Sequence, residues 1–407
     1  MLRLVEAHRA WAEVDLDALS RNLGVIRARA GDGVRVMLVV KADAYGHGAV
    51  AVAHHAIRCG ISSLGVGTGA EALELRSAGI RLPILVLGTV VDDEVAPALR
   101  HGIQIGVHAS DRARSLQELA KKLGTVARVH LNVDTGMGRL GVSPPRALSL
   151  LREIHAAPHL ELGGVMTHVS ATDGARSDIA REQIARFDAF LAEARAEDLP
   201  CGWIHAANSA ALFTGLAPHY DTVRPGISAY GVLPEGLPGA SELQPVLSFK
   251  SQVCFLKDLE AGTPVGYGST WKAPRATRLA TVPVGYDDGV PWRLGNRGEV
   301  LVRGRRAPIV GRVSMDYTTI DVGHIPDVHV GDPVTLFGRD GDEVLGTEEI
   351  ARRVGTIPYE ITCSISRRVT RVYHGGESVE IPSQRPRELG APTPRPAPEP
   401  KMGRTGH

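Results

Sequence analysis

Cysteine is scarce and scattered in this sequence. The 407 residues include four cysteines, Cys59, Cys201, Cys254 and Cys363, and no two of them have the spacing of a redox pair or a metal site. This usage is typical of a reduced chain, so we expect a cytoplasmic protein with neither a disulfide framework nor a zinc site. A metal cofactor is not expected.

The sequence also lacks a strong charge imbalance and a long apolar run. The formal net charge is +1, which gives no reason to expect a nucleic acid or an anionic membrane as a partner. No apolar stretch reaches the roughly 18 residues that a membrane-spanning helix needs. Residues 1–12 carry charges where an export signal would need an apolar block, so no such signal is expected.

What the sequence does contain is a regular alternation of apolar runs and helical patterns between residues 12 and 230. Eight short, almost wholly apolar runs predict strands that are buried under helices, as in a parallel sheet. Eight such units in this length favour a (β/α)8 barrel over an open sheet. The predicted strands are 34–40, 63–66, 84–87, 103–107, 127–133, 160–167, 202–205 and 221–223.

The pattern changes after Pro245, where short β-type runs separated by Gly, Pro and Asp replace the long helices. We therefore predict an α/β chain with a barrel at 12–244, followed by a smaller, mostly β C-terminal domain at 245–381. The opening segment 1–11 is expected to add a strand to this second domain. Residues 382–407 are rich in proline and poor in large apolar residues, which predicts a disordered tail.

The first predicted barrel strand ends abruptly at a lysine, in the stretch VVKADAYGHGAV at residues 39–50. Taken alone, Lys41 is more simply a solvated strand end than a nucleophile. Its position favours the second interpretation, because barrel active sites form at the C-terminal ends of the strands and the preceding apolar residues would partly desolvate the amine. Tyr45 and the glycines after it would allow a ligand to approach closely.

The segment VVKADAYGHGA resembles the cofactor-binding motif of the alanine racemases, in which the lysine binds pyridoxal phosphate covalently. Further segments follow in the family's order over about residues 11–375: AEVDLDALSRN, DTGMGRLGV, MTHVS, HAANSAAL, VRPGISAYGV, VGYGSTW, PVGYDDG, GRVSMDY and PYEITCSISRRVTRVY. The resemblance implies a fold-type-III pyridoxal-phosphate enzyme that interconverts L-alanine and D-alanine for peptidoglycan. It also implies a homodimer with shared active sites.

The resemblance assigns roles to five residues of the reaction centre. Lys41 and Tyr267, the latter reaching in from the partner subunit, would be the two acid–base groups on opposite faces of the cofactor. Arg139 would lie near the substrate on a flexible loop. Arg224 would face the pyridine nitrogen, where an arginine, unlike a carboxylate, cannot keep that nitrogen protonated. His168 would form a hydrogen bond with Arg224.

Further residues would bind the phosphate and line the substrate entrance. Helix starts at a barrel rim suit phosphate, because their N–H groups have no partner within the helix. The residues expected at the phosphate are Tyr45, Asn208, Ser209, Gly226, Ile227 and Tyr359. The partner's Tyr286 and Met315 would narrow the entrance, with Asp316 nearby, so that alanine is preferred to larger amino acids.

Two positions depart from the family's pattern. Asn132 stands where the family often has a carbamylated lysine, so Arg139 must be balanced by another group, such as a bound anion. Ser314 replaces a cysteine of the entrance. Three alternatives stay open beside an alanine racemase: a racemase of broad specificity, a decarboxylase or aldolase on the same barrel, and a barrel that binds pyridoxal phosphate without catalysis. Arg224 argues against the decarboxylases, and the β domain argues against the non-catalytic barrel.

Overall fold

The alternating apolar runs of the first half of the chain form a parallel barrel. The computed structural model describes residues 8–170, 177–234 and 236–376. Within them, eight parallel strands follow the order β8-β7-β6-β5-β4-β3-β2-β9, and the bridge between Asn208 and Arg224 connects the two ends. The predicted barrel is therefore confirmed. Its strands are β2 (Arg35–Val39), β3 (Ser63–Val66), β4 (Ile84–Val86), β5 (Gln104–Val107), β6 (Ala127–Asn132), β7 (Leu160–Met166), β8 (Trp203–His205) and β9 (Thr222–Val223).

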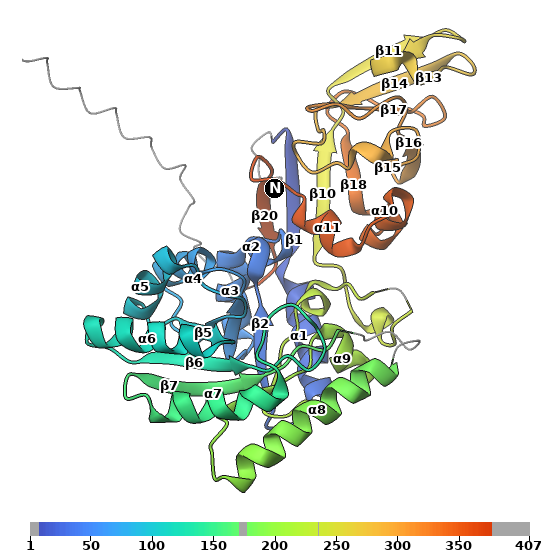
Figure 1. Cartoon of the computed structure of the whole chain (residues 1–407). Helices are drawn as coiled ribbons and strands as arrows, with labels where there is room; N and C mark the ends of the chain where they lie inside the picture. Colours follow the sequence, from blue (N-terminus) through green and yellow to red (C-terminus); the bar gives the residue numbers. More distant parts are fainter. Residues whose placement is uncertain (1–7, 171–176, 235, 377–407) are drawn as a thin grey trace, which may run out of the picture. The chain divides into compact units, whose positions relative to one another are not determined.

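Helices surround these strands, as Figure 1 shows for α5 to α8. Their starts follow ordinary capping chemistry: Asp15 accepts the Ala18 N–H at the first helix, and Thr68 and Glu71 form a capping box at α4. The helices that flank the barrel are α1 (Leu16–Ala30), α3 (Ala49–Arg58), α4 (Gly69–Ser77), α5 (Asp92–Arg100), α6 (Ser110–Leu123), α7 (Pro144–Ala156), α8 (Ser177–Ala196) and α9 (Ser209–Thr214).

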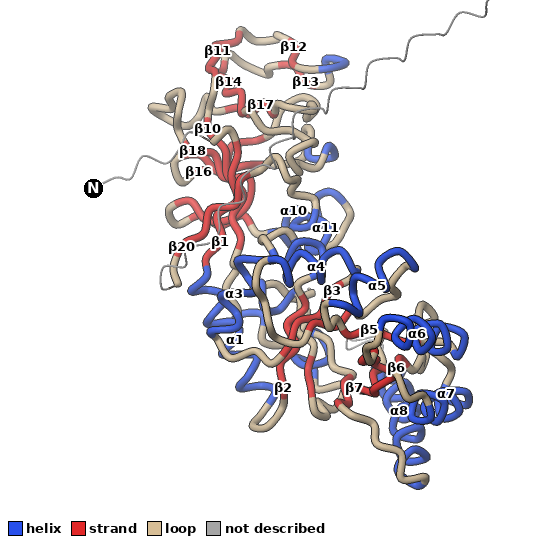
Figure 2. Tube along the Cα trace, turned by 90° about the vertical axis from the view of Figure 1, so that its left-hand side faces the viewer, coloured by secondary structure: helices blue, strands red, loops and turns tan. Residues whose placement is uncertain are grey.

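The second half of the chain forms the predicted β-rich domain. Its larger sheet has the order β16-β15-β18-β10-β1-β20, with β19 paired to β18, and a smaller sheet has the order β11-β14-β17. Figure 2 shows β1, β10 and β18 running side by side. These strands are β10 (Leu247–Gln252), β11 (Phe255–Leu259), β12 (Pro264–Val265), β13 (Trp271–Lys272), β14 (Thr277–Val282), β15 (Glu299–Val302), β16 (Arg305–Pro308), β17 (Thr318–Asp321), β18 (Pro333–Asp340), β19 (Glu343–Leu345) and β20 (Thr370–His374), with helices α10 (Thr347–Val354) and α11 (Pro358–Cys363).

The N-terminal strand β1 (Ala10–Asp15) lies in the larger sheet of the β domain, antiparallel to β10 and parallel to β20. It continues directly into α1, so the expected boundary between residues 11 and 12 falls inside one strand. The described residues of both architectures belong to one unit. The predicted tail 382–407 and residues 1–7 lie outside the described residues. No described helix has the length and apolar character needed to cross a membrane.

Candidate active site

A pocket of about 250 Å³ opens at the C-terminal ends of the barrel strands. It brings together residues that lie far apart in the sequence, because parallel strands present their C-terminal ends on one face of a barrel. The predicted residues that line it are Lys41, Tyr45, Asn132, Arg139, His168, Asn208, Ser209, Arg224, Gly226, Ile227 and Tyr359. The predicted residues Tyr267, Tyr286, Met315 and Asp316 do not line it.

The lysine stands at the start of an unusual backbone turn. In α2 (Lys41–Tyr45), Ala42, Asp43 and Ala44 have φ values of 52°, 53° and 53°, and Tyr45 follows at 55°. Four successive side-chain-bearing residues therefore adopt the left-handed conformation, which costs roughly 1–2 kcal/mol for each of them. Such strain persists only where surrounding contacts hold it in place.

Those contacts come from both sides of the turn. The Glu71 carboxylate of α4 accepts the Ala42 N–H at 2.8 Å, and the Asp43 carboxylate accepts the Ala49 N–H at 2.7 Å. From the β domain, Arg371 donates to the Gly46 carbonyl at 3.0 Å, and the Tyr373 hydroxyl donates to the His47 carbonyl at 3.2 Å. The direction in which Lys41 leaves the strand is thus fixed by its neighbours.

The Lys41 side chain is more exposed than the sequence suggested. The residues just before it, from Val36 to Val40, are buried, yet Lys41 itself is exposed at the pocket mouth. The expected desolvation is therefore wrong for the single chain. Its cause is visible in the geometry: the apolar residues pack beneath the strand, whereas the lysine stem passes over Gly67, where an added Cβ would lie 3.5 Å from Lys41 Cβ.

Arg139 lies on a loop that its own backbone contacts hold in shape. Asp134, at the end of β6, accepts the N–H groups of Gly136, Met137 and Gly138 at 2.8–3.1 Å. The expected flexible loop is thus tied to one carboxylate. The Arg139 side chain is exposed at the pocket rim, and Asn132 is buried in the wall.

The pocket carries a concentration of positive charge. Burial, followed by the charges of Arg224, Arg139 and Lys41, lowers the pKa of His168 to about 3. His168 is therefore neutral at pH 7. The described lining residues include these three cations and no carboxylate. Such a site favours an anionic ligand.

The histidine that contacts Arg224 is His205, which corrects the expected contact with His168. Arg224 Nη1 donates to His205 Nδ1 and to the His205 carbonyl, each at 2.7 Å, while Nη2 donates to the carbonyls of Thr167 and Ala206. The reason is strand geometry: the His205 side chain lies inside the barrel beside Arg224, whereas His168 follows the end of β7. Burial lowers the pKa of Arg224 to about 10, so it stays charged at neutral pH.

The part of the pocket around Gly226 is lined by small groups and hydroxyls. Ser209 Oγ accepts the Gly226 N–H at 2.9 Å, and Asn208 caps α9 through the Ala211 N–H. A Cβ added to Gly226 would lie 2.5 Å from the Tyr45 hydroxyl, so glycine is needed there. The rings of Tyr45 and Tyr359 are 6.0 Å apart, and burial raises the pKa of Tyr359 to about 12, which keeps its hydroxyl protonated.

Three predicted residues of the β domain are exposed and do not line this chain's own pocket. Tyr267, in a turn between Gly266 and Gly268, is 74% exposed, and Tyr286 and Met315 are 45% and 52% exposed. The loops of Tyr286 and Met315 are neighbours, since the Tyr286 N–H donates to the Ser314 carbonyl at 3.0 Å. A larger surface cavity of about 580 Å³ adjoins Tyr286 and Trp292, but it contains no lysine and lies in the β domain.

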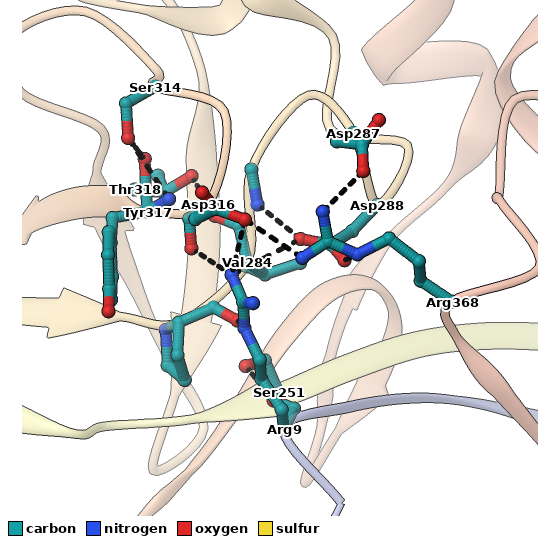
Figure 3. A network of polar contacts seen from close by, with 12 residues as sticks. Arg9, Ser251, Val284, Asp287, Asp288, Ser314, Asp316, Tyr317, Thr318 and Arg368 are labelled. Atoms are coloured by element: carbon teal, nitrogen blue, oxygen red, sulfur yellow. Dashed lines mark hydrogen bonds and ion pairs between the residues drawn. The ribbon is translucent and has the colours of Figure 1, made fainter.

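Asp316 belongs to an ion-pair network that holds these two loops together. Figure 3 shows Arg368 between the carboxylates of Asp287, Asp288 and Asp316, with Arg9 on the other side of Asp316. The hydrogen bond from Arg368 lowers the pKa of Asp316, so the carboxylate stays ionised and paired. In the single chain Asp316 thus acts on the loop of Met315 rather than in the barrel pocket.

Several residues of this site were not singled out from the sequence. Glu71 and Asp134 hold the backbone beside Lys41 and Arg139, and His205 contacts Arg224 directly. His205 had a readable signal, because a histidine inside a short apolar strand needs a buried partner. In the described part of the chain, no cluster of three or more His, Cys, Asp or Glu side chains is suited to hold a metal ion.

Comparison with known proteins identifies a family for both halves of the chain. Residues 14–234 match the family model of the alanine racemase N-terminal domain, and residues 246–373 match that of the alanine racemase C-terminal domain. The alanine racemase of Syntrophobacter fumaroxidans is 45% identical over 368 residues, which covers 90% of this chain and 98% of that protein. The alanine racemase of Symbiobacterium thermophilum is 44% identical over 369 residues, covering 90% and 97%.

Solved structures agree with the sequence relatives. The alanine racemase from Bacillus anthracis with bound L-Ala-P has a TM-score of 0.85 at 36% identity, covering 90% of this chain and 95% of that one. The alanine racemase from Bartonella henselae with covalently bound pyridoxal phosphate has a TM-score of 0.80 at 30% identity, covering 90% and 99%. The chain therefore belongs to the alanine racemase family and is an amino-acid racemase that interconverts L- and D-alanine.

Proposed function

We propose that the enzyme uses pyridoxal phosphate and two acid–base groups, Lys41 and Tyr267 of the partner subunit, in a homodimer with shared sites. Its D-alanine would supply peptidoglycan from the cytoplasm. The observation that carries the proposal is the separate location of the two groups. Lys41 lines the barrel pocket with Arg139 and Arg224, whereas Tyr267 is 74% exposed outside that pocket.

The residues of the pocket fit pyridoxal phosphate. A phosphate needs hydrogen-bond donors, which the hydroxyls of Tyr45 and Ser209 provide beside Gly226, and positive charge, which the pocket cations provide. The Ile227 N–H opens the 3-10 turn Ile227–Tyr230 and has no partner within it. Arg224 would face the ring nitrogen, and Lys41 would hold the aldehyde end. When bound, the cofactor supplies an electron sink that acidifies the Cα–H of the amino acid.

Racemisation then needs one proton donor or acceptor on each face of Cα. Lys41 Nζ would serve one face from the barrel. Among the described residues that line the same pocket, Tyr45 has its phenol at Gly226, and burial with the nearby cations lowers the pKa of His168 to about 3, which makes His168 a weak base. An exposed tyrosine of a second subunit would serve the opposite face, and exposed aromatic residues such as Tyr267 and Tyr286 are typical of a protein–protein contact.

Preference for alanine would come from the partner's Tyr286 and Met315. Their loops are joined by backbone hydrogen bonds and braced by Arg9 and Arg368. Loops held in this way would present a fixed rim rather than an adaptable one. A larger side chain would then lose affinity by steric exclusion.

Replacing Tyr267 with Phe tests the two acid–base groups. Because Phe cannot exchange a proton, exchange of the Cα–H for deuterium in heavy water should continue from only one enantiomer of alanine. Racemisation should fall by roughly a hundredfold or more. The two exchange rates are measured by NMR. Tyr220→Phe, which removes a hydroxyl bonded to Asp188, is the control. Equal loss of exchange from L- and D-alanine would contradict the proposal.

A further inference from the structure

A row of buried polar side chains crosses the barrel behind Arg224. Gln104 lies on β5, His130 on β6 and His205 on β8. Their exposed fractions are 5%, 0% and 0%, and that of Arg224 is 5%. The successive distances are 2.8 Å from Gln104 Oε1 to His130 Nε2, 2.9 Å from His130 Nδ1 to His205 Nε2, and 2.7 Å from His205 Nδ1 to Arg224 Nη1.

Two glycines of β7 make room for this row. β7 lies between β6 and β8, so the His130 side chain must pass across it to reach His205. A Cβ added to Gly163 would lie 2.8 Å from His130 Nε2, and one added to Gly164 would lie 2.7 Å from His130 Nδ1. The strand therefore lacks side chains at the level where the two imidazoles meet.

The direction of every hydrogen bond in the row follows from Arg224. A guanidinium only donates, so His205 Nδ1 must accept and the proton of neutral His205 must sit on Nε2. His205 Nε2–H then donates to His130 Nδ1, which places the proton of His130 on Nε2. That group in turn needs an acceptor, and Gln104 Oε1 is the acceptor beside it. Only one pair of tautomers satisfies all three contacts.

The electrostatic setting favours the same neutral state. Burial and then the positive charges of Arg128 and Arg224 lower the pKa of His130 to about 3. Burial, Arg224 and His130 lower that of His205 well below its usual value. The row contains no carboxylate, and a proton added to either imidazole would turn an acceptor nitrogen into a second donor.

The row also determines what Arg224 can offer to a ligand. Its four Nη–H groups are used by His205 Nδ1 and by the carbonyls of His205, Thr167 and Ala206. The remaining donor is Nε–H, on a side chain that lines the pocket. If His205 presented a donor instead, Nη1 would lose one of its two acceptors and the guanidinium would turn.

We propose that Gln104, His130 and His205 are positioning residues that fix one tautomer chain and so orient Arg224 toward the cofactor ring. The inference rests on the proposed cofactor role of Arg224 but makes a separate claim, about the protonation sites of two histidines. Gln104, which the pocket does not include, is the terminal acceptor on which the chain depends.

The test is the tautomer state of the two histidines in the holoenzyme, read by NMR with ¹⁵N-labelled histidine. Signals are assigned by the loss of one set in His130→Gln and another in His205→Gln. In the wild-type enzyme both rings should carry a single proton on Nε2 and keep it between about pH 6 and pH 8, given their lowered pKa values. Either ring found with its proton on Nδ1 would overturn the inference, whatever the racemase activity.

Substitutions at Gln104 test the dependence on its acceptor. Gln104→Glu should draw a second proton onto His130, so that the His130 Nδ1–H competes with Arg224 for a proton-free nitrogen of His205. Gln104→Met should leave the buried His130 Nε2–H without an acceptor, so that the tautomer pair that Arg224 requires is mixed with the opposite pair. Both should weaken pyridoxal phosphate binding roughly tenfold or more and alter the absorption spectrum of the bound cofactor. Gln117→Met is the control, because Gln117 accepts one backbone N–H, from His159, away from the row.

The Gln104 variants can contradict the inferred role of the row. Unchanged tautomers and cofactor affinity in Gln104→Met, at the level of Gln117→Met, would overturn the inference. If the Gln104 variants do not fold, the wild-type tautomers still decide. A failure of the two-base proposal would appear in the deuterium exchange of Tyr267→Phe and would leave these signals unchanged, so the two claims can fail separately.

Discussion

At the scale of single residues, the motif after the reactive lysine is explained by backbone geometry. Ala42, Asp43, Ala44 and Tyr45 all have positive φ values, which side chains disfavour. Small residues at 42 and 44 limit the clash, and Gly46 and Gly48 take the even more demanding positions that follow, at φ of 85° and 92°. The backbone strain of this turn therefore occurs where Lys41 leaves its strand in one fixed direction.

Glycine at position 42 should reveal this strain. Ala42→Gly should leave the free energy of unfolding unchanged or raise it by up to about 1 kcal/mol, because relief of the left-handed strain offsets the added freedom of the unfolded chain. The control is Ala189→Gly, at an exposed position in the right-handed helix α8, which should lower stability by about 1 kcal/mol. Urea unfolding measures both. Equal losses in the two variants would show that position 42 is not strained.

Many individual residues of the site could be predicted from the sequence, because they belong to motifs with a chemical purpose. Lys41, Arg224 and Tyr45 all line one pocket. His205 could not be chosen over His168 in the same way, since both lie at the C-terminal end of an apolar run: His205 is the last residue of β8, and His168 follows β7. The difference is that strands β5, β6 and β8 each carry a buried polar side chain. Because such groups must pair, the three together were a usable signal.

At the scale of elements, one carboxylate joins the start of α4 to the strained turn. Glu71 accepts the N–H groups of Gly67 and Thr68 at 2.7 and 3.2 Å and that of Ala42 at 2.8 Å. The capping box thus extends from its own helix to the neighbouring βα loop. It ties together the two loops that border Lys41.

Removal of this carboxylate should loosen both loops. Glu71→Ala should lower the free energy of unfolding by roughly 2–3 kcal/mol, since three backbone donors lose a charged acceptor. It should also reduce kcat/KM, because the direction of Lys41 is no longer fixed. Glu74→Ala, at an exposed position of the same helix, is the matched control. Urea unfolding and alanine racemisation are the measurements, and equal behaviour of the two variants would refute the role given to Glu71.

The eight barrel strands could be predicted because each is a short apolar run between turn residues, and burial on both faces needs no more than that. The turn α2 could not. Its residues have no preference for left-handed backbone, and only distant contacts from Glu71, Arg371 and Tyr373 make it stable. Residues 247–256 form one continuous β-type run in the sequence but two strands in the structure, β10 and β11, which belong to different sheets.

At the scale of the whole molecule, buried neutral histidines make stability depend on pH. Burial lowers the pKa of His47 to about 4 and is the main cause that lowers those of His130 and His168 to about 3. Above their ordinary value of 6.5 these groups are neutral in both the folded and the unfolded chain. Below it, the unfolded chain binds protons that the folded chain does not, so folding loses stability as pH falls.

The stability should therefore decline steeply between about pH 6 and pH 4, by roughly 1.4 kcal/mol per pH unit for each of these histidines and for His205, whose pKa burial also lowers well below its usual value. Urea unfolding at a series of pH values measures the slope. His47→Gln should reduce the slope by the share of one histidine, roughly 1.4 kcal/mol per pH unit, since Gln carries no titrating proton. A stability that stays constant down to about pH 5 would contradict the buried, neutral state of these side chains.

The proposed dimer follows from the positions of the two acid–base groups, because a site with Lys41 in one chain and Tyr267 in another cannot work in a single subunit. The barrel pocket and the exposed surface around Tyr267, Tyr286 and Met315 would be the two halves of the shared site. They lie on different parts of one chain. In a twofold-symmetric dimer each half would meet its counterpart twice. The sequence alone could suggest this arrangement only by resemblance.

Mixing two inactive variants tests this central claim most directly. Lys41→Ala and Tyr267→Phe are each dissociated in mild denaturant, combined in equal amounts and allowed to reassociate, and alanine racemisation is then measured. Half of the dimers would be mixed, and each would carry one site with both groups intact, so activity should recover to about a quarter of the wild-type value. Activity that stays at the level of the separate variants, although mixed dimers have formed, would contradict the shared site.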